Sequence, residues 1–239
     1  MPAPLPSNET KRLEALRRYR ILDTPAEEAF DDFAAIASAI CETPIALVSL
    51  VDGDRQWFKA RVGLEAQETP REHAFCAHSI LGEEVMVVED ATSDTRFSAN
   101  PLVTGDPRIR FYAGAPLIDS EGHALGTLCV IDRRARPLDA GRREALEALA
   151  RRVVGQIEMR RTSLELADAL TELKSLRGLL PICAHCKGIR DDAGYWQSVE
   201  SFVMTHSGAD VSHSICPACL KAHHPEVHAR LVAAGKIQG

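Results

Sequence analysis

Apolar residues in the first 140 positions follow two spacings, one typical of helices and one typical of strands. Residues 26–41 (AEEAFDDFAAIASAIC) place four apolar side chains at helical spacing, namely Phe30, Phe33, Ala37 and Ile40. Thr24 stands just before this run and suits a helix N-cap, and Pro25 suits the first helical position. The pattern therefore predicts a helix that begins at Pro25.

Short apolar runs rich in β-branched residues predict strands joined by tight turns. Residues 44–52 and 57–63 flank the turn sequence Gly53-Asp54-Arg55 and predict a hairpin. Further strands are predicted at 85–89, 109–118 and 124–131. Residues 119–122 (DSEG) suit the turn of a second hairpin, and residues 71–80 predict a short helix. Strands joined by short turns, with helices at the ends, indicate an α+β fold with an antiparallel sheet.

A long helix is predicted from Asp139 to about Leu176, where the chain is rich in Ala, Leu, Arg and Glu. It carries two apolar stripes in different registers, Leu146/Leu149/Val153 and Leu166/Ala169/Leu173/Leu176/Leu180. The second stripe has heptad spacing, which leaves two interpretations. The helix could form a short coiled coil in a homodimer, or it could pack on its own domain. Gly178 and Pro181 then end the helical pattern. We expect a first domain at 8–157, a linker helix at 158–177 and a second domain at 178–239.

Composition and charge exclude several classes of protein. The chain has 239 residues, 45% of them hydrophobic and 26% charged, which is typical of a folded globular protein. Its formal net charge is −6, and residues 181–239 hold five basic and five acidic residues, so no basic cluster predicts nucleic-acid binding. No run approaches the ~18 apolar residues of a membrane span, and the N-terminus lacks an apolar signal segment. We therefore expect a cytoplasmic protein.

Four of the seven cysteines form two Cys-x-x-Cys pairs near the C-terminus, Cys183/Cys186 and Cys216/Cys219. In such a pair both sulfurs can reach one metal ion from a tight turn, and two pairs complete a tetrahedron. We therefore predict a structural zinc ion, although thiolates would also bind iron. A redox-active dithiol at Cys216/Cys219 and four cysteines without any ligand are the alternatives.

Three blocks of the first domain resemble the GAF domains of bacterial signalling proteins. They are LVSLVDGDRQWFK, PREHAFCAHSI and VEDATSDTRFSANPLVTGDPRIRFYAGAPLIDSEGHALGTLCVID. The resemblance covers about residues 8–157 and implies a central antiparallel sheet that is flanked by helices and encloses a small-molecule pocket. The stretch that holds the four cysteines is similar to a cysteine-rich module found after sensor or receiver domains in bacterial signalling chains.

If the first domain binds a ligand, its aromatic and polar residues near these motifs are the candidates. Trp57, Phe75 and Tyr112 would form apolar walls, and His78, Asn100 and Arg110 would orient polar groups. For the aromatic residues, packing in the core is the alternative, and Asn100 before Pro101 also suits a turn.

Cys76 is a further candidate, because a thiolate near an imidazolium is a better nucleophile. Residues i and i+2 of a helix point in different directions, however, so Cys76 and His78 are not expected to pair. Cys129 lies in an apolar strand, where packing in the core is the default.

These features favour a non-enzymatic signalling protein, whose GAF domain senses a small molecule or docks a partner and relays the signal through the zinc-stabilised module. No nucleotide-binding glycine motif of a kinase and no Gly-Gly-Asp/Glu-Glu-Phe motif of a cyclase is present. The partner would be a kinase, a cyclase or a regulator. One alternative is a thiol-dependent reductase of free methionine sulfoxide that uses Cys76 or Cys129. The other is a transcriptional regulator that binds nucleic acid through the cysteine module.

Overall fold

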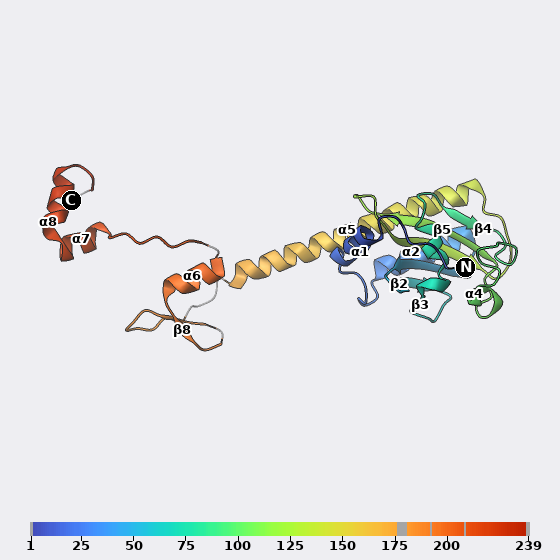
Figure 1. Ribbon diagram of the computed structural model, residues 1–239, viewed down its shortest axis with the longest axis horizontal. Coiled ribbons are helices and arrows are strands. Elements are labelled where there is room, and N and C mark those ends of the chain that lie inside the picture. The colour runs from blue at the N-terminus through green and yellow to red at the C-terminus, as the bar shows by residue number, and fades with distance from the viewer. Residues whose placement is uncertain (1, 176–180, 192, 208, 238–239) are drawn as a thin grey trace. The chain divides into compact units, whose positions relative to one another are not determined.

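The computed structural model describes residues 2–175, 181–191, 193–207 and 209–237, and the chain divides into two units at Ala167/Asp168 (Figure 1). The first unit is built on an antiparallel sheet with the strand order β3-β2-β1-β6-β5-β4. Its strands are β1 (Ile45–Val51), β2 (Arg55–Val62), β3 (Glu68–Pro70), β4 (Met86–Val88), β5 (Phe111–Ile118) and β6 (Ala124–Asp132). The predicted α+β fold with an antiparallel sheet is confirmed.

One face of this sheet packs against the three longer helices of the unit, α1 (Glu9–Arg18), α2 (Glu28–Cys41) and α5 (Ala140–Ser175). Alternation along β1 directs Ala46, Val48 and Leu50 to this face. There they share one buried core with residues from each helix, among them Leu16, Phe30 and Leu146. Figure 1 shows these helices lying along the sheet.

The other face of the sheet is covered by short elements and loops. The intervening residues of β1, which include Ile45 and Leu47, share a second core with Tyr112 of β5 and Cys129 of β6. The cover consists of a 3₁₀ turn η1 (Arg71–His73) and the short helices α3 (Phe75–Ser79) and α4 (Pro101–Thr104). Short elements leave space that a long helix would fill, and the cavity described below lies on this face.

Helix α2 starts later than the sequence predicted. It begins at Glu28, and Thr24 is not its N-cap. The Thr24 hydroxyl instead donates to the Ile21 carbonyl at 2.7 Å and accepts from Lys59 Nζ at 2.8 Å. The Lys59 side chain is fully buried, so its ammonium group needs oxygen partners. Besides Thr24, it donates to the Pro25 carbonyl at 2.7 Å. This demand keeps Thr24 and Pro25 out of the helix.

The predicted strands are present, with small shifts at their ends. Arg55, predicted in the turn, is the first residue of β2, and the strand predicted from residue 109 begins at Phe111. The predicted 71–80 helix is divided into η1 and α3. Helix α1, strand β3 and helix α4 were not predicted.

The long helix predicted from Asp139 is observed as α5 over Ala140–Ser175. Leu146 and Val153 of its first stripe are buried in the core of the first unit. Leu166, from the second stripe, is exposed, as is Ala169. The side chain of Leu173, and Leu176, Gly178 and Leu180, lie outside the described residues, so dimerisation through this stripe stays a prediction.

Beyond the end of α5, the described part of the second unit contains only short elements. They are β7 (Ile189–Arg190), β8 (Trp196–Gln197), α6 (Val199–Ser207), α7 (Pro217–His223) and α8 (Pro225–Ala233). Strands β7 and β8 pair antiparallel to form a small hairpin. Across the described parts of both units, no helix combines the length and the apolar character that crossing a membrane requires.

Candidate ligand cavity and thiol pair

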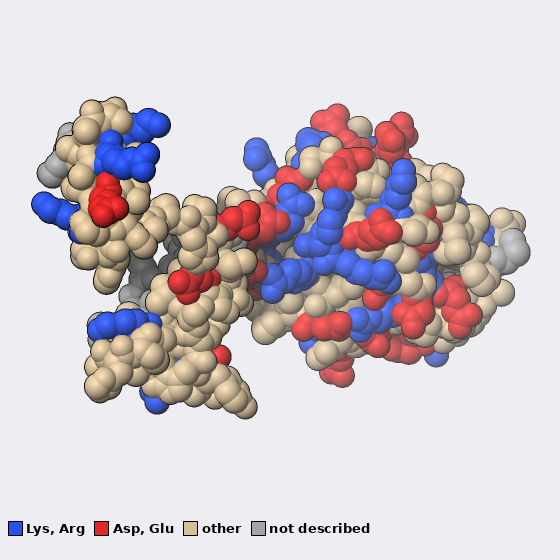
Figure 2. All heavy atoms as spheres, turned by 60° about the vertical axis from the view of Figure 1, so that its left-hand side comes forward, with Lys and Arg blue, Asp and Glu red and all other residues tan. Residues whose placement is uncertain are grey.

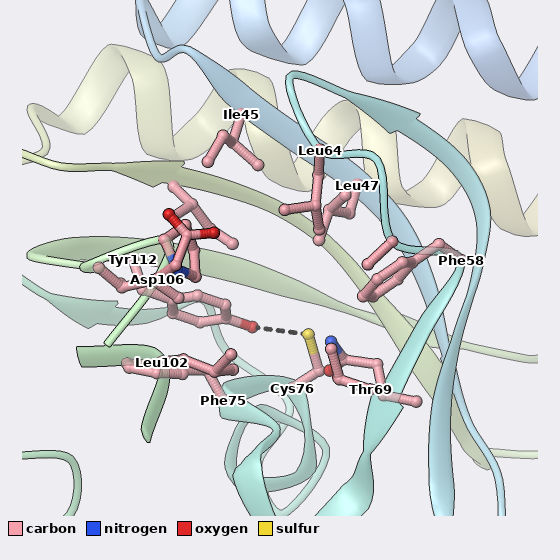
Figure 3. Close-up of a pocket in the computed structure, with 15 residues that line it drawn as sticks. Ile45, Leu47, Phe58, Leu64, Thr69, Phe75, Cys76, Leu102, Asp106 and Tyr112 are labelled. Atoms are coloured by element: carbon pink, nitrogen blue, oxygen red, sulfur yellow. Dashed lines mark hydrogen bonds between the residues drawn. The ribbon is translucent and has the colours of Figure 1, made fainter. Parts of the chain in front are cut away.

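A cavity of about 140 Å³ lies between the sheet and its cover of short elements (Figure 3). Its walls are mainly apolar and come from every strand of the sheet except β4, from α3 and α4, and from the loops before β3 and after α4. The apolar side chains in contact with it include Leu47, Phe58, Leu64, Phe75 and Leu102. A cavity of this size and character accepts a molecule about as large as benzene.

Few polar groups reach the cavity, and one of them has no partner. Gln56 is 5% exposed, and its Nε2 donates to Thr69 Oγ1 at 3.3 Å. Its Oε1 is buried and has no hydrogen-bond partner among the described residues. Asp106 is exposed and also lines the cavity, so it marks where the cavity reaches the surface. Gln56 thus brings a buried acceptor without a partner to the wall of the cavity.

Two cysteines that are far apart in the sequence meet beside this cavity. The Sγ atoms of Cys76 on α3 and Cys129 on β6 are 3.8 Å apart, and both residues are at most 1% exposed. Thr127 Oγ1 donates to Cys76 Sγ at 2.9 Å, and the Tyr112 hydroxyl donates to it at 3.4 Å (Figure 3). Cys76 lines the cavity, whereas Cys129 does not.

The surroundings of Cys76 favour its thiolate. Burial acts to raise the pKa of this thiol, but hydrogen bonds from Cys129, Thr127 and Tyr112 outweigh burial and lower the pKa to about 7. The pKa of Cys129 lies well above its usual value because this thiol is hydrogen-bonded to Cys76 and is buried. Burial and the nearby Cys76 also raise the pKa of Tyr112 well above its usual range. Near neutral pH, Cys76 is therefore the nucleophilic member of the pair.

Two small residues fix the position of the Tyr112 hydroxyl. Ser79 Oγ lies 2.9 Å from it, within hydrogen-bond distance. Gly114 follows Tyr112 by two residues on β5 and therefore faces the same side of the sheet. A Cβ atom at position 114 would collide with the Tyr112 hydroxyl, so glycine is required there.

The structure brings three of the predicted ligand residues to the cavity, namely Phe75, Cys76 and Tyr112. Trp57 lies elsewhere, since it belongs to the core on the helical face of the sheet. His78 does not line the cavity, and its ring stands edge-on to Phe97 with centroids 4.8 Å apart. Cys76 and His78 both belong to α3, and the expectation that they do not pair stays a prediction.

Asn100 and Arg110 support the cavity wall rather than line it. Asn100 caps α4 by accepting from Leu102 N at 2.9 Å, and its Nδ2 donates to the His73 carbonyl at 3.0 Å. Arg110 Nη1 donates to the carbonyls of Val103 and Ile109, each at 3.0 Å. These bonds hold the segment that carries Leu102 and Ile109 against the cavity.

Sequence reasoning missed Gln56, Thr127 and the pairing of Cys76 with Cys129. Alternation along β6 places Thr127 and Cys129 on one face, and this was the available signal. That α3 packs against the same face depends on tertiary contacts, which a single sequence does not reveal.

The four C-terminal cysteines form two separate turns, each closed by its own local hydrogen bonds. Lys187 N donates to the Cys183 carbonyl at 3.0 Å, and Cys219 N donates to Cys216 Sγ at 3.4 Å at the start of α7. These bonds form within one pair and do not require the other pair to be near. All four thiols are free, and Cys186, Cys216 and Cys219 are exposed.

The predicted zinc site is therefore not confirmed. Within the described ranges, no three His, Cys, Asp or Glu side chains gather closely enough to hold a metal ion. The structure thus does not unite the four predicted ligands, which are Cys183, Cys186, Cys216 and Cys219.

Comparison with known proteins identifies the first unit. The family profile of the GAF domain matches residues 25–157. The chain belongs to the GAF domain family. The GAF domain of a phosphoenolpyruvate-protein phosphotransferase from Coxiella burnetii has the same fold, with a TM-score of 0.50 and 17% identity over 66% of this chain and 98% of that one. The corresponding domain from Acinetobacter gives a TM-score of 0.49 and 16% identity over 66% and 97%.

A curated relative is known from Pseudomonas aeruginosa, where it is named a cyclic di-GMP phosphodiesterase. It is 47% identical to this chain over 161 residues. The match spans 67% of this chain and 27% of the relative, so the chain is similar to about a quarter of that protein. A GAF domain of the signalling type is thus shown for this chain.

Proposed function

We propose that the GAF unit senses a small, largely apolar molecule that carries one hydrogen-bond donor, and that the protein relays its binding to a partner without converting the ligand. The observation that carries this proposal is a mainly apolar cavity whose wall contains Gln56, a residue with a buried and unpartnered Oε1. An unpaired buried acceptor costs about 1–3 kcal/mol, and a donor on the ligand would remove that cost.

The dimensions of the cavity favour a ligand of phenol size. About 140 Å³ is close to the ~150 Å³ of apolar cavities that take up benzene. A cyclic dinucleotide is far larger and carries two phosphates. The described lining residues include no Lys, Arg or His to pair with phosphate.

The same lining disfavours the reductase of free methionine sulfoxide. The meeting of Cys76 and Cys129 favours thiol chemistry, but a free amino acid also brings a carboxylate and an ammonium group. Asp106 could bind the ammonium group, whereas no basic side chain among the described lining residues is available for the carboxylate. We therefore rank ligand sensing above this enzymatic function.

The signalling partner is proposed from the relative. A segment similar to this chain occurs in a protein named for cleaving cyclic di-GMP, which supports a partner that makes, breaks or responds to a signalling nucleotide. A kinase or another regulator fits the same role. Binding to nucleic acid through the cysteine module is less well supported, because residues 181–239 hold as many acidic as basic residues. Figure 2 shows Lys and Arg gathered in the middle of one face of the first unit, with Asp and Glu around them.

A four-cysteine zinc ion in the second unit remains part of the proposal. Thiolates in two Cys-x-x-Cys turns are the ligand set of structural zinc sites. The turns at Cys183 and Cys216 support this assignment, since each has formed around its own pair. Such an ion would hold the module that passes the signal to the partner.

Titration with phenol and benzene, followed by calorimetry or ligand-observed NMR, tests the sensing function. Phenol is expected to bind several-fold more tightly than benzene, because only phenol can donate to Gln56 Oε1. In Gln56→Leu the preference should disappear while benzene still binds. Gln67→Leu is the matched control, since Gln67 is exposed in the segment between β2 and β3. Failure of both compounds to bind the wild-type protein would refute the proposal.

A further inference from the structure

We propose that Cys76 and Cys129 form a reversible disulfide in response to a hydroperoxide, which makes the GAF unit a sensor of peroxide as well as of a ligand. The thiol pair has no role in ligand sensing as proposed above. It is nevertheless built in detail, with two hydroxyl groups directed at one sulfur.

The geometry places the two sulfurs in non-bonded contact. They are 3.8 Å apart and must approach by about 1.8 Å to reach the ~2.05 Å of a disulfide. Cys129 is fixed in β6, between β1 and β5 at the centre of the sheet. Cys76 belongs to α3, a helix of five residues, which can adjust more easily than the sheet.

The chemistry proceeds in two balanced steps. The Cys76 thiolate attacks one peroxide oxygen, so that an S–O bond forms and the O–O bond breaks. The departing hydroxide or alkoxide takes up a proton and leaves as water or alcohol. Cys129 then attacks the sulfenic sulfur of Cys76, forming the S–S bond and breaking the S–O bond, and its proton leaves with the oxygen as water. Two thiols are oxidised and one peroxide is reduced.

The positions of the two cysteines set the order of these steps. Cys76 lines the cavity and is reached by a small neutral peroxide that enters it, whereas Cys129 does not line the cavity. The lowered pKa of Cys76 and the raised pKa of Cys129 agree with this order. Cys41, on α2, is buried in the core of the other face, and burial raises its pKa. It is therefore an internal reference for a buried thiol that should stay reduced.

Disulfide formation would also change the cavity. Drawing Cys76 toward β6 moves α3, and the neighbouring Phe75 on α3 is a cavity wall. Conversely, a molecule in the cavity covers Cys76 and should delay its oxidation. The two inputs, ligand and peroxide, would thus compete at one site.

Peptide mapping of the full-length protein tests the disulfide directly. Tryptic cleavage leaves Cys76 in the peptide 72–96, Cys129 in 111–133 and Cys41 in 21–55, with one cysteine in each. After brief treatment with hydrogen peroxide and blocking of free thiols, we expect 72–96 joined to 111–133, and 21–55 with a free thiol. Dithiothreitol should restore both peptides. Peroxide that leaves Cys76 and Cys129 reduced, or that oxidises Cys41 equally fast, would overturn the proposal.

Variants identify the role of each group. Cys129→Ser should leave Cys76 as a sulfenic acid that dimedone captures, Cys76→Ser should give no cross-link, and Cys41→Ser should cross-link as the wild type does. Thr127→Val removes the donor at 2.9 Å and should slow cross-linking several-fold at pH 7. An unchanged rate in this variant would contradict the assignment of Cys76 as the attacking thiolate.

Saturation with benzene tests the route through the cavity and should slow cross-linking several-fold. If benzene binds and the rate is unchanged, peroxide does not enter through the cavity, and that step of the proposal fails. The peptide mapping without benzene needs no ligand, so it stands or falls independently of the Gln56 experiment.

Discussion

Arg12 shows how a single charged residue can be held in the interior of this protein. It is fully buried, and its Nη1 donates to the Val51 carbonyl at the end of β1 at 2.7 Å. Glu9 supplies the opposite charge at 2.8 Å and also pairs with Arg71. Burial acts to raise the pKa of Glu9, but the two guanidinium groups outweigh it and lower the pKa to about 2. Helix α1 is thereby joined to the β1–β2 turn.

We predict that this carboxylate makes the first unit sensitive to acid. A lowered pKa in the folded state adds stability above the usual pKa of 4.5, and this is lost as the pH falls toward 2. Glu9→Gln should cost about 3 kcal/mol at pH 7, because the buried Arg12 loses its counter-charge. The difference in unfolding free energy between Glu9→Gln and the wild type should shrink as the pH falls from 4.5 toward 2.

Urea unfolding followed by Trp57 fluorescence, in a Trp196→Phe background, measures this effect. Trp57 is buried in the first unit and Trp196 is exposed in the second, so the signal then reports the first unit alone. Glu14→Gln is the control, since Glu14 is an exposed carboxylate on the same helix. If both variants lose the same unfolding free energy at pH 7, the ion pairs of Glu9 do not stabilise the first unit.

At the scale of elements, a second buried charge joins the sheet to α5. Lys59 of β2 donates to Glu27 Oε1 at 2.7 Å, and Arg160 of α5 donates to the same oxygen at 2.8 Å. Burial acts to raise the pKa of Glu27, but these two cations outweigh it and lower the pKa. Strand β2 also lines the cavity through Phe58, so the cavity and α5 share one strand.

We predict that Glu27→Gln destabilises the first unit more than Arg160→Met does. The first variant leaves the fully buried Lys59 ammonium without its counter-charge, which costs about 3 kcal/mol. The second leaves Glu27 paired with Lys59, and the Arg160 side chain is partly exposed, so about 1 kcal/mol is expected. Thermal unfolding of both variants measures the two losses of stability. If Arg160→Met is the more destabilising variant, the pair of Glu27 with α5 stabilises the unit more than the pair with Lys59.

Particular elements show why part of the fold could be predicted and part could not. Strands β1, β5 and β6 are nearly continuous apolar runs bounded by turns, and every strand except β3 was predicted with errors of a few residues at its ends. Helix α1 has a polar sequence whose burial depends on Arg12, and β3 is only three residues long. The cavity was predicted in kind from the family, but Gln56 and the Cys76–Cys129 contact depend on packing between distant segments.

At the scale of the whole molecule, the two units differ in how much core they contain. The first unit has two clusters of buried apolar side chains, one on each face of its sheet. Among the described residues of the second unit, only Ile189, Phe202 and His228 are buried. So small a core does not balance the entropy of ordering such a chain, and a metal ion is the usual remedy in a cysteine-rich module. This contrast supports the proposed zinc ion.

We predict that removing the metal unfolds the second unit and leaves the first intact. The purified protein should contain one zinc per chain, and a Cys183→Ser/Cys216→Ser variant should contain none. A strong zinc chelator should abolish the hydrogen-exchange protection of α7 and α8 and leave that of β1 and β6 unchanged, because binding free energy is folding free energy in such modules. Metal analysis and exchange mass spectrometry measure both. Metal-free protein with α7 and α8 equally protected would show that the second unit is stabilised in another way.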